Sequence, residues 1–507
     1  MNRLLLALTL IILLTACSSS ATPSPTATLP PTLAAGSSTL EPIRPTKTKK
    51  PKENNPQAAQ VSTKQPKGTN PQAAPTSTNA DFIATEILGR PTNTSVTVNV
   101  VPAIAMEIYY EVGTSSGAYT SQTAPQTAAA NTPVETLISG LQPNTRYYYR
   151  IHYNGNAGTE HSFVTQRTVG SIFTFAIQAD SHLNTDKHCN PDLYSLTMLN
   201  VAAAQPDFFI DLGDTFRTDM LKDINPTTIL KNYVDQRQYF GMVSNSAPLF
   251  LVNGNHEMEW GWLLDGTAEN PAVWSANDRN LYYPQPVPDN FYTGDTQYVA
   301  NIGQLRDYYA WTWGDALFVV IDPYWSTTSD PKQSKDNWDW TLGEAQYQWF
   351  RQTLETSDAT YKFVFTHHVL GESRGGVEQA GLFEWGGKDR GGSWGFDAHR
   401  PGWGKTIHQL MVENGVTIFF QGHDHLFARQ ELDGVIYQTV PMPADSTYQT
   451  PNQEFYTSGV TRPESGYLRV TVSSQGVTVD YIRSFLPKDE NASQQNGMVD
   501  YTYTVTP

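Results

Sequence analysis

Apolar and polar residues follow three different patterns along this chain of 507 residues. Residues 1–80 contain one short apolar run, 4–14, and no aromatic residue. Residues 81–167 alternate apolar and polar positions in short runs, which predicts β-strands with one buried face. From residue 168 to 507, nearly continuous apolar runs alternate with helical stretches, which predicts an α/β body with strands covered on both faces.

Most of the strands and two helices of this body can be placed from the apolar runs. The predicted strands span residues 172–179, 207–212, 248–252, 316–321, 361–366 and 416–420. The predicted helices span residues 193–204 and 342–356. Three further runs near the C-terminus, which we expect to form sheet edges, span residues 467–472, 476–482 and 499–505.

The first 17 residues have the pattern of a signal peptide. Arg3 precedes an apolar run of 11 residues, which is too short to span a bilayer comfortably. The sequence Leu14-Thr15-Ala16-Cys17 then resembles a bacterial lipobox, in which the signal is cut before a cysteine that becomes lipidated. The resemblance predicts an extracytoplasmic lipoprotein held on the cell membrane through Cys17. The alternative is an ordinary signal peptide in which Cys17 occurs by chance.

Residues 18–80 are rich in Ser, Thr, Pro, Ala and Lys, and such a segment cannot bury enough apolar surface to fold. We predict an extended spacer; contact of its lysines with a cell wall or with anionic lipid is the alternative.

Residues 1–80 carry eight basic and two acidic side chains, and the rest of the chain carries 25 basic and 47 acidic ones. Because the body has a net charge of −22, no specific nucleic-acid binding is expected.

A short motif describes the small β region more closely. The sequence Leu141-Gln-Pro-Asn-Thr-Arg-Tyr147 precedes a predicted strand and resembles the tyrosine corner of fibronectin type III domains. Residues 81–167 also resemble the N-terminal domain of purple acid phosphatases. We expect a structural sandwich that positions the following domain, with a carbohydrate- or partner-binding module as the alternative.

Five polar fragments follow predicted strands of the α/β body, where the strands end. They are Asp180-Ser-His182, Gly213-Asp214, Gly254-Asn255-His256-Glu257, His367-His368 and Gly422-His423-Asp-His425. The carboxyl ends of strands are the usual place for binding sites in α/β sheets. Carboxylate, amide and imidazole groups without thiolates suit divalent metals such as Mn, Fe, Zn or Mg. The pattern therefore predicts a metal centre.

In order and spacing, the fragments resemble the sequence blocks of the calcineurin-like metallophosphoesterases. The resemblance implies a four-layer αββα sandwich for residues 168–507, behind a small all-β fibronectin III-like sandwich. It also implies two divalent metal ions. One ion is expected to bind Asp180, His182, Asp214 and His425. The second is expected to bind Asn255, His367, His423 and the bridging Asp214.

The same resemblance implies hydrolysis by attack of a metal-bound hydroxide on phosphorus. Asp214 and His256 are the expected catalytic residues, and His256 stabilises the transition state or protonates the leaving oxygen. Glu257 fills the acidic position of its block, where holding the loop is the alternative role.

Purple acid phosphatases carry a tyrosine where this chain has Arg217, so tyrosinate–iron chemistry is not expected. Arg217 also cannot replace the acid that supports the catalytic histidine in related protein phosphatases.

A Gly- and Trp-rich stretch, residues 371–404, lies between two ligand motifs and must begin and end near the site. We expect a substrate cap in which Arg374 and Arg390 bind phosphate oxygens. The alternative is a structural loop whose tryptophans pack on the domain. Arg217 and His368 are further candidate substrate contacts, and the aromatic residues between 257 and 313 are candidates for an opposite wall.

These resemblances together imply a membrane-anchored extracytoplasmic phosphoesterase, and the similarity to acid-phosphatase architecture favours phosphate monoesters as its substrates. A phosphodiesterase or nucleotidase on the same two-metal core is the close alternative. An alternative of a different class is a catalytically inactive surface binding or adhesion lipoprotein.

Overall fold

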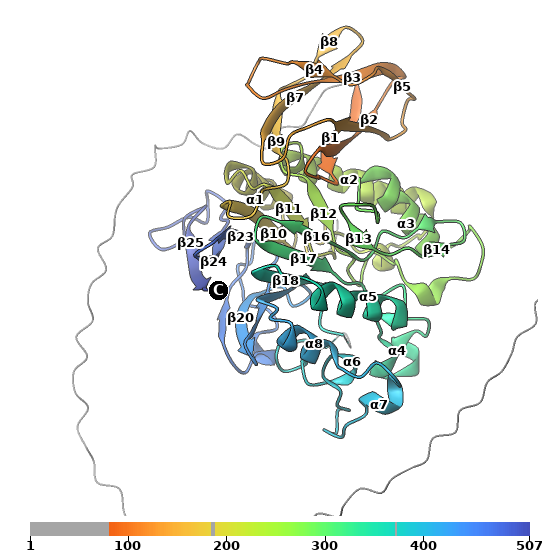
Figure 1. Ribbon diagram of the computed structural model, residues 1–507, viewed down its shortest axis with the longest axis vertical. Helices are drawn as coiled ribbons and strands as arrows, with labels where there is room; N and C mark the ends of the chain where they lie inside the picture. Colours follow the sequence, from red (N-terminus) through yellow and green to blue (C-terminus); the bar gives the residue numbers. More distant parts are fainter. Residues whose placement is uncertain (1–80, 184–187, 371–372) are drawn as a thin grey trace, which may run out of the picture. The chain divides into compact units, whose positions relative to one another are not determined.

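The computed structural model describes residues 81–183, 188–370 and 373–507, which begin with an all-β region (Figure 1). One sheet of this region has the order β1–β2–β6, and the other is built around β3 and β7. The predicted signal peptide, Cys17 and the spacer lie outside the described residues. The strands are β1 (Phe82–Gly89), β2 (Ser95–Pro102), β3 (Met106–Gly113), β4 (Ser121–Gln122), β5 (Gln126–Ala128), β6 (Val134–Ser139), β7 (Arg146–Tyr153), β8 (Asn156–Ala157) and β9 (His161–Val164).

The two sheets of the all-β region bury one face each, as the alternating sequence predicts. Val96 and Val98 of β2 pack in one cluster with Tyr149 and Ile151 of β7. The hydroxyl of Tyr147 accepts a hydrogen bond from the backbone N–H of Gln142 at 2.8 Å. This contact ties the start of β7 to the preceding turn, which is the role of a tyrosine corner.

Two larger sheets form the α/β body. The first has the order β12–β11–β10–β23–β24–β25, with β10, β11 and β12 parallel to one another. Its strands are β10 (Phe173–Gln178), β11 (Phe208–Asp211), β12 (Leu249–Leu251), β23 (Gly466–Ser473), β24 (Gly476–Arg483) and β25 (Val499–Val505). The predicted strands 172–179, 207–212 and 248–252 are thereby confirmed.

The second sheet has the order β13–β16–β17–β18–β19–β21–β20–β22, and β17, β18 and β19 are parallel. Its strands are β13 (Thr293–Gly294), β16 (Tyr309–Trp313), β17 (Ala316–Val320), β18 (Tyr361–Phe365), β19 (Ile418–Gln421), β20 (Phe427–Leu432), β21 (Val435–Thr439) and β22 (Val460–Arg462). A separate hairpin joins β14 (Tyr298–Val299) and β15 (Gly303–Gln304).

Helices cover the outer face of each sheet, which gives the body four layers (Figure 1). Apolar side chains of both sheets meet in the middle, where Phe175 and Phe208 pack against Phe318. The helices are α1 (Pro191–Ala203), α2 (Pro226–Ser244), α3 (Pro271–Tyr282), α4 (Pro331–Ser334), α5 (Gly343–Glu355), α6 (Phe383–Gly386), α7 (Phe396–His399) and α8 (Ile407–Glu413). Short 3₁₀ turns are η1 (Thr218–Met220), η2 (Gly261–Leu263), η3 (Asn337–Asp339) and η4 (Gln453–Phe455).

Three of these helices begin with the same dipeptide, Asn-Pro. The side chains of Asn190, Asn225 and Asn270 accept hydrogen bonds from the first backbone N–H groups of α1, α2 and α3. The proline that follows has no N–H to leave unsatisfied, so the pair is a strong start signal. Within the described residues, no helix combines the length and apolar character needed to cross a bilayer.

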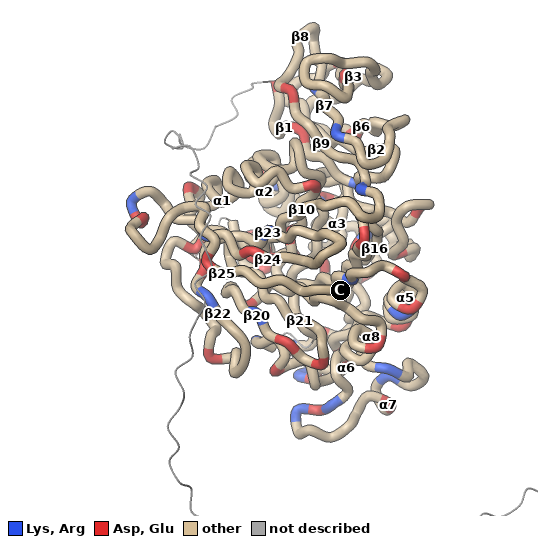
Figure 2. The backbone as a smooth tube through the Cα atoms, turned by 60° about the vertical axis from the view of Figure 1, so that its left-hand side comes forward, with Lys and Arg blue, Asp and Glu red and all other residues tan. Residues whose placement is uncertain are grey.

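The placement of the C-terminal strands differs from the sequence prediction. We expected all three to form sheet edges, but β23 lies inside the first sheet, paired with β10 on one side and β24 on the other. Of these three strands, only β25 lies at an edge of that sheet (Figure 2). The reason is the burial of Leu468 and Val470, which join the core between the sheets.

One buried guanidinium group links the all-β region to the body. Arg237 of α2 is 1% exposed, and its Nη1 donates to the side-chain oxygen of Asn99 in β2 at 2.8 Å. Its Nη2 donates to the carbonyl oxygens of Thr85 in β1 at 2.8 Å and of Asn99 at 3.1 Å. The described residues belong to one compact unit, and Arg237 is one reason why.

Replacing Arg237 with leucine is expected to lower the free energy of unfolding by about 3 kcal/mol, because buried acceptors lose charged donors. The midpoint of urea unfolding measures this change. Lys231→Leu on the same helix is the control, since the Lys231 side chain is exposed. Equal midpoints for the Arg237 variant and the wild type would show that this link does not stabilise the protein.

Candidate metal centre

The candidate metal ligands follow the carboxyl ends of strands in both sheets. Asp180 comes two residues after β10, Asp214 three after β11, and Asn255 four after β12. His367 comes two residues after β18, and His423 two after β19. Because the strands within each group are parallel, their carboxyl ends meet at one edge of the body.

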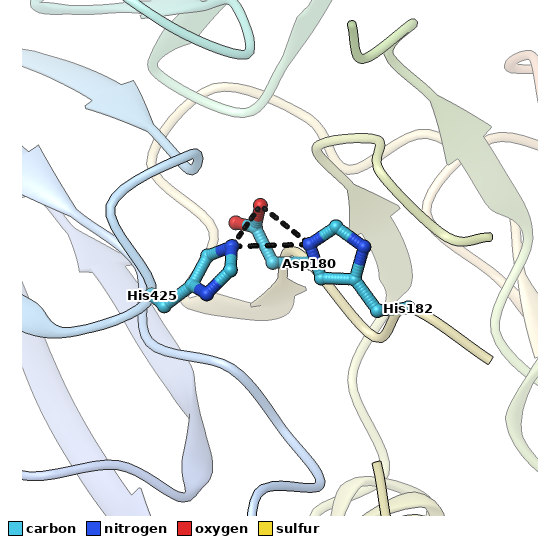
Figure 3. Close-up of side chains that lie close together, drawn as sticks. All are labelled: Asp180, His182 and His425. Atoms are coloured by element: carbon cyan, nitrogen blue, oxygen red, sulfur yellow. Dashed lines mark hydrogen bonds and ion pairs between the residues drawn. The ribbon is translucent and has the colours of Figure 1, made fainter. Parts of the chain in front are cut away.

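Three side chains converge at one half of the centre (Figure 3). The Oδ1 atom of Asp180 lies 3.7 Å from His182 Nε2 and 3.5 Å from His425 Nε2. The two imidazole Nε2 atoms are 3.0 Å apart. All three residues are buried, so their polar atoms face one another instead of water.

A second group of Asp214, His367 and His423 lies beside the first. The Oδ2 atom of Asp214 is 3.1 Å from His367 Nε2 and 3.9 Å from His182 Nε2. Asp214 therefore lies between the two groups, which is the position that the resemblance implies for a bridging carboxylate. His367, and not His368, takes part in this group.

Several buried polar atoms fit metal ions. Asn255 Oδ1 and Asp180 Oδ1 are buried and accept no hydrogen bond from any other residue that the structure describes. His367 Nδ1 lies 2.8 Å from the carbonyl oxygen of Leu212, which fixes the proton on Nδ1 and leaves Nε2 to face Asp214. Oxygen and imidazole donors without thiolate suit a pair of divalent ions, so the residues present fit the implied cofactor.

The buried carboxylates of the centre favour the binding of positive charge. Burial disfavours the charged form of His367, but the carboxylates of Asp214 and Asp180 outweigh it and raise the pKa of His367 to about 10. The pKa of Asp214 lies well below its usual range, because His367 and His256 overcome the effect of burial. Two divalent cations supply positive charge of the same kind at the same place.

The backbone is strained around the centre. Among the seven candidate ligands, positive φ angles occur at Asp180 (59°), His182 (45°), Asp214 (52°), His423 (69°) and His425 (65°). Residues with side chains rarely adopt this conformation, and they persist in it where the surroundings over-determine them, commonly at functional sites. A Cβ at Gly254 would lie 2.3 Å from Asp214 Oδ1, so glycine is required there.

His256 has a carboxylate partner that the sequence reasoning missed. Its Nδ1 atom is 2.7 Å from Asp219 Oδ1, and its Nε2 atom is 3.8 Å from Asp214 Oδ2. Asp219 therefore orients the ring toward the metal ligands. The resemblance places a supporting acid at position 217, where this chain has arginine; the acid lies two residues later, at the 3₁₀ turn η1.

Glu257 holds the loops together. Its Oε1 accepts a hydrogen bond from the backbone N–H of Thr215 at 2.8 Å, and its Oε2 accepts one from the N–H of Gly254 at 2.9 Å. The carboxylate thus joins the loop that carries Asp214 to the loop that carries Asn255. This is the loop-holding role that the sequence left open.

The comparisons with known proteins agree with this geometry. Residues 173–427, half of the chain, match the family model of the calcineurin-like phosphoesterases. The chain belongs to this family. Among solved structures, that of PhoD has 15% sequence identity and a TM-score of 0.58, over 85% of this chain and 90% of PhoD. No similar protein was found among curated sequences.

A second solved structure is purple acid phosphatase PPD1 from yellow lupin (Lupinus luteus) seeds. It has 16% identity and a TM-score of 0.56, over 83% of this chain and 74% of that protein. At these identities the likeness shows the fold, which confirms the predicted mixed α/β class with an all-β region ahead of it. As a calcineurin-like phosphoesterase, the chain carries its clustered Asp and His residues where a centre of two divalent ions is expected.

The candidate substrate contacts of this phosphoesterase lie at different depths. Arg374 is 30% exposed, donates to the carbonyl oxygen of His423 and lies 3.1 Å from Asp424 Oδ1. Arg390 is exposed and donates to Ser373 Oγ at 3.0 Å. His368 is 1% exposed, and its Nδ1 lies 2.8 Å from the carbonyl oxygen of Val369. Arg217 is half-buried directly before η1. Arg374 and His368 both lie at the centre, since Arg374 contacts His423 and the ring centroid of His368 is 5.0 Å from that of His423.

Most of the aromatic residues proposed for a cap and a wall are core residues. Trp385 and Trp403 pack in the core beneath α5 and α8, as in the structural alternative, and only Trp394 is exposed. On the other side, Trp260 and Trp262 are half-buried. The expected opposite wall is wrong for the tyrosines, which are buried: Tyr282, Tyr283, Tyr292, Tyr308 and Tyr309.

Arg374→Ala is expected to raise the KM for a phosphate monoester about tenfold or more, because a guanidinium group beside the ligands can bind phosphate oxygens. Arg390→Ala is the matched control and is expected to change kcat/KM less than about threefold, since Arg390 contacts Ser373 in the outer loop. Steady-state kinetics of both variants measure the difference. A larger rise in KM for Arg390→Ala than for Arg374→Ala would show that Arg390, and not Arg374, is the phosphate contact.

Proposed function

We propose that this protein is a two-metal phosphoesterase that hydrolyses phosphate monoesters outside the cytoplasm, on a lipid anchor at Cys17. The observation that carries the catalytic part is the convergence of buried carboxylate and imidazole atoms beside an oriented histidine. When bound, the two ions supply an activated water and a positive clamp for the phosphoryl oxygens.

The residues of the chain supply the rest of the proposed chemistry. Asp214 lies between the two groups of ligands and keeps them at a fixed spacing. His256 has 17% of its side chain exposed, so a substrate can reach it. With Nδ1 held by Asp219, Nε2 is the atom that holds the proton for the leaving oxygen. Arg374 binds the phosphate from the side of His423.

Monoester specificity rests on the likeness of the architecture to acid phosphatases, including the tyrosine-corner contact of Tyr147 in a fibronectin III-like region. The test uses metal-reconstituted protein with p-nitrophenyl phosphate and bis-p-nitrophenyl phosphate. A higher kcat/KM for the monoester supports the proposal. A higher value for the diester makes the protein a phosphodiesterase, and no turnover of either ester with two ions bound favours the binding-protein alternative.

The anchor is tested by its covalent chemistry. The lipobox-like sequence that ends at Cys17 supports lipidation. Metabolic labelling of the producing cells with an alkyne fatty acid is expected to mark the wild type and not Cys17→Ser. Cys189→Ser is the control, since burial raises the pKa of the Cys189 thiol to about 12. Label that persists in Cys17→Ser would contradict the anchor.

A further inference from the structure

A cavity of about 430 Å³ lies between α5 and the edge of the second sheet, away from the metal centre. Its floor includes Leu317 in the amino-terminal half of β17, where Leu317 pairs with Lys362. The candidate ligand His367 follows the opposite, carboxyl end of the parallel strand β18. A molecule in this cavity therefore does not compete with a phosphate ester at the metals.

The lining of the cavity combines polar side chains with apolar ones such as Phe291 and Leu317, and it carries no positive charge. None of the described residues that line it is Lys, Arg or His, so an anionic ligand has no partner there. A purely apolar ligand would bury hydroxyl and amide groups without hydrogen bonds, which is unfavourable. The side chains relevant to recognition are Trp349, Thr293, Thr312, Gln352, Thr356 and Asp358.

One aromatic ring in the lining is held in a fixed orientation. Trp349 of α5 is half-buried, and its ring centroid lies 4.8 Å from that of Tyr308. Its indole N–H donates to Thr293 Oγ1 at 3.3 Å. An aromatic side chain fixed on both sides binds a ring-shaped ligand with little loss of conformational freedom.

We propose that this cavity binds a neutral saccharide. The C–H face of a pyranose ring packs on Trp349, and its hydroxyl groups exchange hydrogen bonds with Gln352, Thr356 and Asp358. The volume lies within the ~300–1,000 Å³ range of small-molecule sites. Such a site holds the protein on a glycan-bearing surface independently of its action on phosphate esters.

The test is binding of the full chain to an array of neutral and anionic glycans. The wild type is expected to bind at least one neutral glycan, and Trp349→Ala to bind it at least tenfold more weakly. Trp349→Phe keeps an aromatic face and is expected to retain most of the binding. Trp394→Ala removes a tryptophan that is 56% exposed elsewhere and is the matched control.

Thermal unfolding of each variant separates loss of the site from loss of the fold. Equal unfolding midpoints, with weaker glycan binding only in Trp349→Ala, support the site. The proposal is overturned if the wild type binds no neutral glycan more tightly than Trp349→Ala does, or if it binds anionic glycans alone. The glycan-binding assay does not depend on phosphoesterase activity, so failure of the proposed phosphoesterase function would not affect the conclusion about this site.

Discussion

Asp214→Asn is expected to lower kcat/KM for a phosphate monoester by at least about 10³-fold, which corresponds to several kcal/mol of transition-state stabilisation. Asp214 Oδ2 faces both groups of candidate ligands, at 3.1 Å from His367 Nε2 and 3.9 Å from His182 Nε2. The amide has nearly the same shape but no charge, so it weakens the site for both ions. It also removes the negative charge that raises the pKa of His367.

The measurement is steady-state kinetics with p-nitrophenyl phosphate, together with the metal content of each protein. Asp235→Asn is the matched control, because Asp235 pairs with Lys231 on the exposed side of α2. The control is expected to keep the activity of the wild type. Activity of Asp214→Asn within tenfold of the wild type would show that this carboxylate does not bridge two functional ions.

The second large effect is expected at His256. His256→Ala is expected to lower kcat by about 10²–10⁴-fold, the range for loss of a general acid, with a smaller change in KM. The metal ligands remain in this variant, so its metal content is expected to equal that of the wild type. Single-turnover kinetics measure the chemical step directly.

Asp219 tests the same assignment through its contact with His256. Asp219→Asn keeps the size of the side chain but weakens the orientation of the ring, and we expect kcat to fall about tenfold or more. Asp223→Asn, four residues further on in an exposed position, is the control. If Asp219→Asn had no effect while His256→Ala did, the 2.7 Å contact would be structural only.

Much of the centre could be predicted because its signals are local. Each candidate ligand follows directly after a buried strand, and parallel strands bring their carboxyl ends together whatever the loops contain. The short spacing between Asp180 and His182, and between His423 and His425, lets a single loop present both side chains. The choice of His367 over His368 also followed from the motif, and the structure groups His367 with Asp214.

Features that depend on loop conformation and on packing between distant elements were not predictable in this way. Asp219 reaches His256 because the 3₁₀ turn η1 brings it there, and no spacing rule gives that position. The sequence near residue 309 is as rich in tyrosine as an exposed aromatic wall would be, so composition alone does not reveal that these tyrosines are buried. The strand β23 pairs with β10 across nearly 300 residues of sequence, by the register Phe175↔Val470. Only the three-dimensional arrangement distinguishes these cases.

The most direct test of the two-metal centre is the number of ions bound per chain, measured by elemental analysis alongside activity. Protein stripped with a chelator is titrated with Mn²⁺, Fe²⁺, Zn²⁺ or Mg²⁺ in separate series. The predicted result is two ions per chain at saturation with at least one of these metals. Phosphoesterase activity is expected to rise with occupancy, and Asp214→Asn to bind fewer ions. Full activity in the stripped protein, or saturation at fewer than two ions per chain, would contradict the centre described above.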